Sequence, residues 1–319
     1  MNAIEVFCPG SVANISCGFD ILGLCLDSIG DTMRVKKVSK KGITIKSISG
    51  YNLSLKTNEN AAGVSALALL NQYKNIDYGF EIEIIKKIKP GSGIGSSAAS
   101  ASGSVFAINE LLGKPFSKKE LVKFALEGEY ICSKSYHADN ISPLIFGGIT
   151  LVRDHKELDI VNLPTPSKLY VTIIHPQIEL KTSDSRSVLK QKVTLEKAIQ
   201  QSANIASLIS GLYSNDYNLI SRSLIDVLVE PHRSDLIPAF SELKNTCKDY
   251  GALGSGISGS GPSVFALSIS IIELKPSETN NCAIVVSISK FLITDLGLSN
   301  SLTFNSVCLT DRLFFNICS

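Results

Sequence analysis

A glycine-rich segment at residues 90–102, PGSGIGSSAASAS, carries the clearest chemical signal in the chain. Three glycines in five positions permit positive φ angles and let a ligand approach the backbone closely. The small residues that follow indicate a helix, whose first turn offers unpaired N–H groups and partial positive charge. These features are typical of a phosphate site, although the segment alone also fits a flexible surface turn. The predicted phosphate contacts are Pro90, Gly91, Ser92, Gly93, Ile94, Gly95, Ser96, Ser97 and Ala98.

The common nucleotide and nucleophile signatures do not describe this segment. It lacks the lysine of a G-x-x-x-x-G-K-[ST] loop, and the chain has no G-x-S-x-G nucleophile elbow. Residues 254–259, GSGISG, match G-x-G-x-x-G. They follow a predicted helix and precede a strand-like run, however, which reverses the order that dinucleotide binding needs. We interpret this second glycine cluster as a loop that could lie against the first across a domain interface.

A nucleotide phosphate bound without a P-loop lysine still needs a divalent cation, and the cation needs oxygen ligands. Ser97 and Glu129, on two successive predicted helices, supply a hydroxyl and a carboxylate. A solvated helix face is the alternative for Glu129. Zinc is disfavoured, because the eight cysteines form no C-x-x-C pair and the four histidines do not cluster beside them. Reduced thiols are expected, because a chain of this size can form a core without disulfides.

The segment YHADNISP at 136–143 is polar without an evident structural reason. His137, Asp139 and Asn140 within it are therefore candidate contacts for a small molecule. An ordinary polar loop with internal hydrogen bonds is the alternative.

Two arginines, Arg186 and Arg233, lie near predicted turns or helix starts. A guanidinium presents a rigid fork that suits a carboxylate or phosphate bidentately. Most single arginines form surface salt bridges, so neither residue decides the matter alone.

The composition excludes several classes of protein. At 319 residues and 44% apolar content, the chain is long enough for two domains and ordinary for a globular protein. Its 31 basic and 29 acidic residues are spread along the sequence, without the basic stripe that nucleic-acid binding needs. No apolar run approaches the roughly 18 residues of a membrane span, and the first residues do not resemble a signal peptide. We therefore expect a cytoplasmic protein with neither a nucleic-acid nor a membrane partner.

Hydrophobic periodicity predicts an α+β fold in two domains, 1–163 and 164–319, separated near the proline-containing stretch 162–168. In the first half, the expected strands are 3–8, 21–26, 32–38, 42–48, 79–88 and 147–153, and the expected helices are 60–73, the stretch from the glycine loop to Gly113, and one that begins with a capping box at Ser117. In the second half, we expect a strand at 169–175, helices at 183–190, 195–213, 217–229 and 234–250, and a strand after the second glycine cluster.

Three motifs together resemble those of the GHMP small-molecule kinases. They are SVANISCGFDILGLCL at 11–26, the glycine-rich segment at 90–102, and GSGISGSGPS at 254–263. The segment at 136–143 is similar to the one that separates the homoserine-phosphorylating members of this family from the others. The resemblance extends over roughly residues 3–268.

The resemblance implies a two-domain GHMP kinase fold, in which an N-terminal ATP-binding domain contains a left-handed βαβ crossover and the C-terminal domain is ferredoxin-like. It implies ATP as the co-substrate, with its phosphates on the glycine-rich segment and Mg²⁺ held by Ser97 and Glu129. Asn60, near the start of the first predicted helix, is a candidate for contact with adenine. Cys17 and the C-terminal residues 306–319 depart from the family pattern, which leaves the shape of the acceptor loop and the C-terminal packing open.

The resemblance also implies the molecule that accepts the phosphoryl group. The positions of this chain that match the acceptor-binding residues of the family are Asn14, Asp20, His137, Asn140, Arg186 and Arg233. Their chemistry fits an amino acid, because the arginines can bind its carboxylate, Asp20 its ammonium group, and Asn140 can orient its hydroxyl. The implied reaction is ATP-dependent phosphorylation of the side-chain hydroxyl of L-homoserine to O-phospho-L-homoserine, a step in threonine biosynthesis. A kinase of another small alcohol and a non-catalytic ligand sensor are the alternatives.

Phosphoryl transfer needs alignment and charge neutralisation more than covalent help, so the expected catalytic residues are Asn140, Glu129 and Ser97. Several relatives have an aspartate as general base where this chain has Asn140, and Asp139 next to it is the alternative base. We expect the proton to leave to solvent or phosphate without a dedicated base. The oligomeric state is left open, with a homodimer as one of the states considered.

Overall fold

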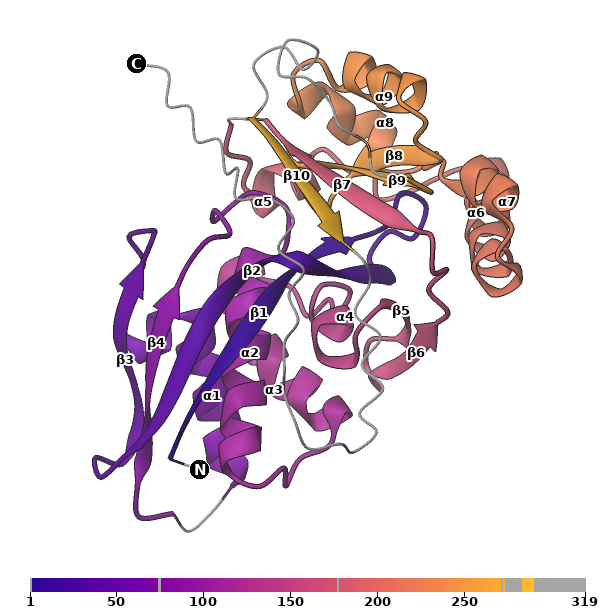
Figure 1. Ribbon diagram of the computed structural model, residues 1–319. Helices are drawn as coiled ribbons and strands as arrows, with labels where there is room; N and C mark the ends of the chain where they lie inside the picture. The colour runs from indigo at the N-terminus through magenta and orange to yellow at the C-terminus, as the bar shows by residue number, and fades with distance from the viewer. Residues whose placement is uncertain (1, 74–75, 177, 271, 273–282, 290–319) are drawn as a thin grey trace, which may run out of the picture.

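Two units make up the protein, an N-terminal one with a six-stranded sheet and a C-terminal one with a four-stranded sheet (Figure 1). The structure is a computed structural model and describes residues 2–73, 76–176, 178–270, 272 and 283–289. The chain crosses from one sheet to the other between residues 163 and 170. The predicted α+β class with two domains is therefore confirmed. The divergent C-terminal residues 306–319 lie outside the described residues.

The N-terminal sheet has the order β3-β4-β2-β5-β6, with β1 paired to β2. Its strands are β1 (Ala3–Ala13), β2 (Leu22–Val38), β3 (Gly42–Ser49), β4 (Gly79–Ile85), β5 (Ile149–Asp154) and β6 (Asp159–Leu163). One face is covered by helices α1 (Ala61–Gln72), α2 (Ser96–Leu111) and α4 (Ile141–Phe146), with a short 3-10 turn η1 (Thr57–Glu59) before α1 (Figure 1). Helix α3 (Lys118–Ser133) packs against these helices. The alternating residues Phe80, Ile82 and Ile84 of β4 are buried in the core that this packing forms.

Local sequence signals explain several of these elements. Ser117 and Glu120 form the predicted capping box at the start of α3, in which each side chain bonds to the backbone of the other residue. Gly103 lets α2 approach the sheet, because a Cβ there would lie 2.1 Å from Cys8 Sγ. The parallel pair β3 and β4, joined through α1, forms a βαβ unit. The left-handed path of this crossover stays a prediction.

The first strands differ from the prediction. The stretches 21–26 and 32–38 were expected to be separate strands, but they form the single strand β2. The prediction of two strands was wrong because β1 pairs with β2 along most of its length. A register shift in β1 between Pro9 and Ser11 lets this pairing continue on both sides of the interruption. The intervening Gly30 packs closely under the ring of Phe7.

The C-terminal sheet has the order β10-β7-β9-β8, and all its pairs are antiparallel. The strands are β7 (Tyr170–His175), β8 (Gly254–Ile257), β9 (Val264–Ser268) and β10 (Ala283–Ser289). Between β7 and β8 lie α5 (Thr182–Ser187), α6 (Leu195–Ser214), α7 (Tyr217–Ser223), α8 (Glu230–Arg233), the 3-10 turn η2 (Ser234–Leu236) and α9 (Phe240–Asp249). In chain order this sheet reads fourth, first, third, second, which is the strand order of a ferredoxin-like domain and agrees with the prediction.

Three helices of the C-terminal unit are shorter than predicted, and the first of them, expected at 183–190, ends at Ser187. The helix expected at 217–229 ends at Ser223. Asp226 then accepts from the backbone N–H groups of Leu228, Val229 and Glu230, which holds the turn that leads into α8. The helix expected at 234–250 begins only at Phe240. Pro238 explains this delay, because a proline disfavours helical geometry at the residue before it.

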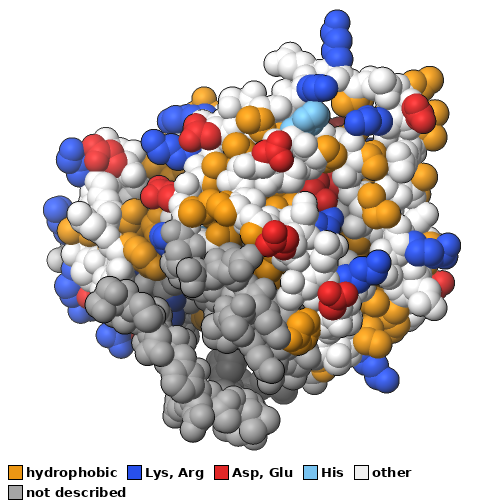
Figure 2. Space-filling view, turned by 90° about the horizontal axis from the view of Figure 1, so that it is seen from above, with side chains coloured by type: hydrophobic (Ala, Val, Ile, Leu, Met, Phe, Trp, Pro, Cys, Tyr) orange, Lys and Arg blue, Asp and Glu red, His pale blue; other side chains and the backbone are white. Residues whose placement is uncertain are grey.

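The surface carries charges of both signs. Figure 2 shows lysine, arginine and acidic side chains interspersed on the described part of one face, rather than gathered by sign. Among the described residues, no helix is long and apolar enough to cross a membrane.

Candidate active site

The glycine-rich segment forms a turn that exposes its backbone. Gly91, Gly93 and Gly95 have φ angles of 72°, 81° and 70°, in the region that favours glycine. Helix α2 then begins at Ser96, and Gly95 serves as its N-cap. Several N–H groups of the loop and of the first helical turn are thereby brought together, as the phosphate prediction requires.

The second glycine cluster lies against the first, as expected. It forms strand β8 and the start of the turn from β8 to β9. In this turn Ser258 Oγ donates to the carbonyl of Gly93 at 2.8 Å, and the N–H of Ser263 donates to Ser92 O at 3.2 Å. The contact is close enough that a Cβ on Gly93 would lie 2.5 Å from the carbonyl oxygen of Gly261. The reversed G-x-G-x-x-G pattern thus serves to hold the glycine-rich loop in place from the other unit.

A buried ion pair lies beneath the start of α2. Lys86 Nζ pairs with Asp31 Oδ2 and donates to Ser96 O at 2.8 Å and to Ser100 Oγ at 3.1 Å. The second oxygen of Asp31 accepts from the backbone of residues 87 and 88. Both charged side chains are almost completely buried, at 1% and 0% exposure. This ion pair joins the end of β4, the long strand β2 and the first turn of α2.

We expect the Lys86→Met variant to lose about 3–5 kcal/mol of unfolding free energy, because it leaves the Asp31 carboxylate buried without its cation. Urea denaturation followed by circular dichroism measures this loss. The control is Lys114→Met, which removes an exposed i,i+4 pair with Glu110 and costs at most about 0.5 kcal/mol. Equal losses in the two variants would contradict the prediction.

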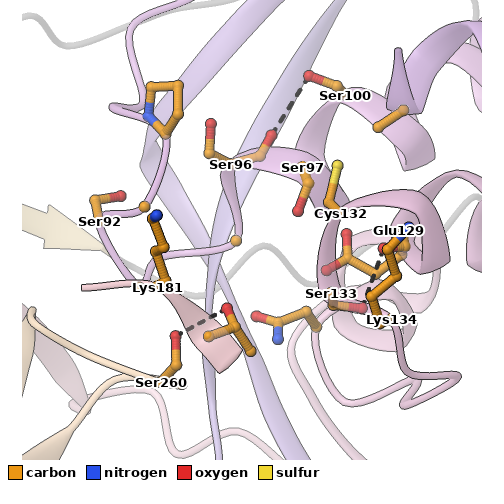
Figure 3. Close-up of a pocket in the computed structure, with 18 of the residues that line it drawn as sticks. Ser92, Ser96, Ser97, Ser100, Glu129, Cys132, Ser133, Lys134, Lys181 and Ser260 are labelled. Carbon is orange, nitrogen blue, oxygen red and sulfur yellow. Dashed lines mark hydrogen bonds between the residues drawn. The ribbon is translucent and has the colours of Figure 1, made fainter. Parts of the chain in front are cut away.

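A cleft of about 710 Å³ lies between the two units, beside the glycine-rich loop. The N-terminal unit contributes the loop, the start of α1 and the end of α3, and the C-terminal unit contributes residues 179–183 and the β8–β9 turn (Figure 3). A second cavity, of about 70 Å³, is lined by the predicted acceptor residues. Glu129, Asn140, Thr182 and Arg186 line both cavities, so the two are adjacent.

Ser97 and Glu129 meet at the wall of the large cleft, where α2 begins and α3 ends (Figure 3). Glu129 is 9% exposed and its Oε2 has no hydrogen-bond partner among the described residues. Burial raises the pKa of Glu129 to about 7, and the Ser97 hydroxyl partly opposes this rise. The solvated helix face that the sequence left open is therefore excluded for Glu129.

The small cavity holds a cluster of charges around Asp20. Arg186 Nη2 and Nη1 lie 2.8 and 3.2 Å from its two carboxylate oxygens, and His137 Nδ1 lies 2.9 Å from Oδ2. A hydrogen bond from His137, followed by the bond from Arg186, lowers the pKa of the Asp20 carboxyl against the opposing effect of burial. Arg186 and Arg233 both lie over the ring of Phe19, at 5.6 and 5.2 Å from its centroid.

Arg233 is nearly buried, at 2% exposure, and donates to the carbonyls of Ser185 and Gly259. Its burial, together with the charge of Arg186, lowers its pKa to about 10, so the guanidinium stays charged at neutral pH. Asn14 accepts from the backbone N–H of Asp20 at 3.0 Å and donates to Gly259 O at 2.9 Å. Both side chains thus tie the acceptor cavity to the β8–β9 turn.

Asn140 lies at the junction of the two cavities. Its Oδ1 accepts from Ser11 Oγ at 2.7 Å, which fixes the orientation of the amide. Asp139 next to it is buried and points to the same cluster; burial, and then the charge of Asp20, raises the pKa of its carboxyl. The segment predicted as a polar loop continues directly into α4, which the sequence did not predict.

Asn60, the candidate adenine contact, lines the large cleft but uses its side chain for structure. Its Oδ1 accepts from the backbone of Ala62 and Gly63, and its Nδ2 donates to Ser54 O at 3.0 Å. It is therefore the N-cap of α1.

Cys17, which departs from the family pattern, is buried in the core, and its carbonyl accepts from Gln201 Nε2 at 2.7 Å. Burial raises the pKa of its thiol to about 12. Its side chain does not line either cavity.

Several residues of the site were missed at the sequence level. They are Ser11, Phe19, Lys86, Lys181, Thr182 and Ser260. Lys86 had a usable signal, since it continues the inward-facing alternation of Phe80, Ile82 and Ile84 along β4. The other missed residues lie in short loop segments, where hydrophobic periodicity gives no indication of a functional role.

Comparisons with known proteins agree with this geometry. The family profile described as GHMP kinases N terminal domain matches residues 60–148, and the profile for the GHMP kinases C terminal domain matches residues 204–278. The homoserine kinase of Chlorobium phaeobacteroides strain DSM 266 is 40% identical over 97% of this chain and 98% of its own length. That of Chlorobaculum tepidum is 42% identical, over 85% of this chain and 87% of its own.

Solved structures of GHMP kinases are also similar to this protein. The crystal structure of homoserine kinase from Cytophaga hutchinsonii superposes with a TM-score of 0.84 and 43% identity, over 91% of this chain and 95% of that one. The mevalonate kinase of L. major, at 17% identity and a TM-score of 0.64 over 84% of this chain and 87% of its own, shares the fold alone. The chain belongs to the GHMP kinase family, and the predicted kinase class is confirmed. Within that family, the relatives named above at 40–43% identity are homoserine kinases.

Proposed function

We propose that this kinase transfers the γ-phosphoryl group of ATP to the side-chain hydroxyl of L-homoserine, giving O-phospho-L-homoserine and ADP for threonine biosynthesis. The observation that carries the proposal is that the two cavities adjoin. The large cleft beside the glycine-rich loop is next to the small cavity that contains the ion pair between Asp20 and Arg186. An α-amino acid brings both an ammonium and a carboxylate group to Asp20 and the two arginines. Mevalonate or a sugar would leave the Asp20 carboxylate without a cationic group of the substrate.

The acceptor residues have distinct tasks in this proposal. The guanidinium groups of Arg186 and Arg233 bind the substrate carboxylate, while Asp20, held in place by Asn14 and His137, binds its ammonium group. Asn140, oriented by Ser11, leaves its amide nitrogen to hold the reacting hydroxyl at the junction. The substrate thereby replaces the ion pair between Arg186 and Asp20.

The residues at the wall of the cleft fit a magnesium ion. A buried carboxylate oxygen of Glu129 without a partner, next to the Ser97 hydroxyl, supplies the hard oxygen ligands that Mg²⁺ prefers. When bound, Mg²⁺ neutralises charge that develops on the phosphates. The backbone of Pro90–Ala98 positions the phosphate chain, and the hydroxyl proton is released to solvent or phosphate.

The remaining assignments follow from the same proposal. The ATP-binding domain covers residues 1–163 and the C-terminal domain residues 164–319. The reaction takes place in the cytoplasm, where the buried free thiols of Cys8, Cys17 and Cys25 stay reduced. Light scattering on the purified protein distinguishes a monomer from a homodimer.

One assay tests the proposal. Purified protein is incubated with ATP, Mg²⁺ and, in separate reactions, L-homoserine, L-serine, L-threonine or mevalonate, and ADP release is followed. We expect homoserine to give the highest kcat/KM, with serine lower by about 10- to 200-fold because it is one methylene shorter. Absence of homoserine-dependent ADP release would refute the proposal.

A further inference from the structure

The rim of the nucleotide cleft opposite the glycine-rich loop carries a lysine that no known part of the site accounts for. Lys181 is the N-cap residue of α5 and lines the cleft from the C-terminal unit. Figure 3 shows its ammonium group directed toward the glycine-rich loop, on the side where Ser92 lies. The loop itself contains no charged side chain between residues 90 and 98.

The other cations that line this cleft are engaged elsewhere. Lys86 is held in the buried ion pair beneath α2, and Arg186 is paired with Asp20. Lys134, at the end of α3, lies over a tyrosine ring at 5.8 Å. Within the described part of the chain, the ammonium group of Lys181 makes no hydrogen bond and no ion pair. Lys181 therefore has a charge available for a ligand.

The backbone of Lys181 is fixed relative to the loop. Its carbonyl accepts from the N–H groups of residues 184 and 185 at the start of α5. Ser185 Oγ in turn donates to Ser260 O at 2.7 Å, in the β8–β9 turn. Since Ser258 of that turn bonds to Gly93, a continuous set of hydrogen bonds connects the base of the lysine to the glycine-rich loop. The side chain of Lys181 therefore extends toward the glycine-rich loop from a backbone that is fixed relative to that loop.

We propose that Lys181 binds the terminal phosphate of ATP and stabilises the charge of the transferring group. In the transfer, the bond between the γ-phosphorus and the β,γ-bridging oxygen breaks and its electron pair leaves with ADP. The acceptor oxygen forms the new bond to phosphorus and releases its proton to solvent or phosphate. The ammonium group keeps its proton and acts by charge and hydrogen bonding. The inference rests on the proposed ATP-dependent reaction. The carboxylate of Glu179 lies on the same rim, against Gly91.

The test compares Lys181→Met and Lys181→Arg with Lys190→Met, an exposed lysine just after α5 that lines neither cavity. For each purified protein, kcat/KM for ATP is measured, and calorimetry gives the affinities for ADP and for a non-hydrolysable ATP analogue. We expect Lys181→Met to lose about tenfold or more in kcat/KM and in analogue affinity, with ADP affinity little changed. Arginine should restore most of the loss, and Lys190→Met should match the wild type.

Two results would overturn the inference. One is a Lys181→Met variant that equals Lys190→Met in both kcat/KM and analogue affinity. The other is an equal loss of affinity for ADP and for the analogue, because that would place the lysine away from the terminal phosphate. Failure of the proposed function is a separate result, in which the wild-type protein does not phosphorylate homoserine. In that case, the affinities for ADP and for the ATP analogue still show whether Lys181 binds the terminal phosphate.

Discussion

The Glu129→Gln variant is expected to lose on the order of 10²- to 10³-fold in kcat, with little change in protein content or fold. Glutamine keeps the size of the side chain but removes the anionic oxygen that fits Mg²⁺ beside Ser97. A loss of several kcal/mol of transition-state stabilisation corresponds to this factor. Steady-state assays at saturating ATP, repeated over a range of Mg²⁺ concentrations, measure it.

The same variant should be more stable than the wild type in the absence of ligands. The folded-state pKa of Glu129, about 7, lies above its ordinary value of 4.5, so the folded protein holds the extra proton between these values. The free energy of unfolding contributed by this group therefore falls as pH rises from 4.5 to about 7, and stays low above that. Glutamine has no charge to bury, so thermal unfolding at pH 8 should occur at a higher temperature in Glu129→Gln.

The control for both measurements is Glu127→Gln on the same helix, since the Glu127 carboxylate is exposed and lines neither cavity. It should leave kcat and the unfolding temperature unchanged. If Glu129→Gln retained wild-type turnover at low Mg²⁺, the assignment of Glu129 as a metal ligand would be wrong. If it were destabilised at pH 8, the buried, unpaired carboxylate would not have the energetic cost that we infer.

The Arg186→Met variant should raise KM for homoserine roughly 10²-fold, while KM for ATP changes little. Arg186 presents two N–H groups to a carboxylate, as its pair of contacts with Asp20 illustrates, and two charge-assisted hydrogen bonds account for a factor of this size. Methionine keeps the aliphatic stem of the side chain but makes none of these bonds. Initial rates as a function of each substrate separate the two KM values.

A substrate analogue makes this prediction specific to the carboxylate. The amino alcohol that lacks the carboxylate of homoserine should be a poor acceptor for the wild type and no poorer for Arg186→Met. Arg222→Met, at an exposed arginine on α7, is the control and should leave both KM values unchanged. If Arg186→Met reduced the use of both acceptors equally, Arg186 would act through the shape of the cavity rather than through the substrate carboxylate.

Features that depend on neighbouring residues were determined by the sequence itself. The glycines at 91, 93 and 95 predicted a turn with positive φ before a helix, and the structure has that turn. The capping box at Ser117 and the alternation along β4 were likewise correct, since short-range hydrogen bonds and side-chain period decide them. Recognition of the family rested on the same local segments.

The tertiary structure decided what depends on contacts between distant residues. The ion pair between Asp20 and Arg186 joins positions 166 residues apart, and no local pattern in either segment implies the other. The continuity of β2 was likewise set by its partner strand β1 rather than by its own turn-forming residues. Lys86 and Lys181 approach the glycine-rich loop from opposite units. The sequence determined which groups could bind a phosphate or an amino acid, and the packing of the two units decided which of them share one cleft, because long-range contacts are fixed only when the core forms.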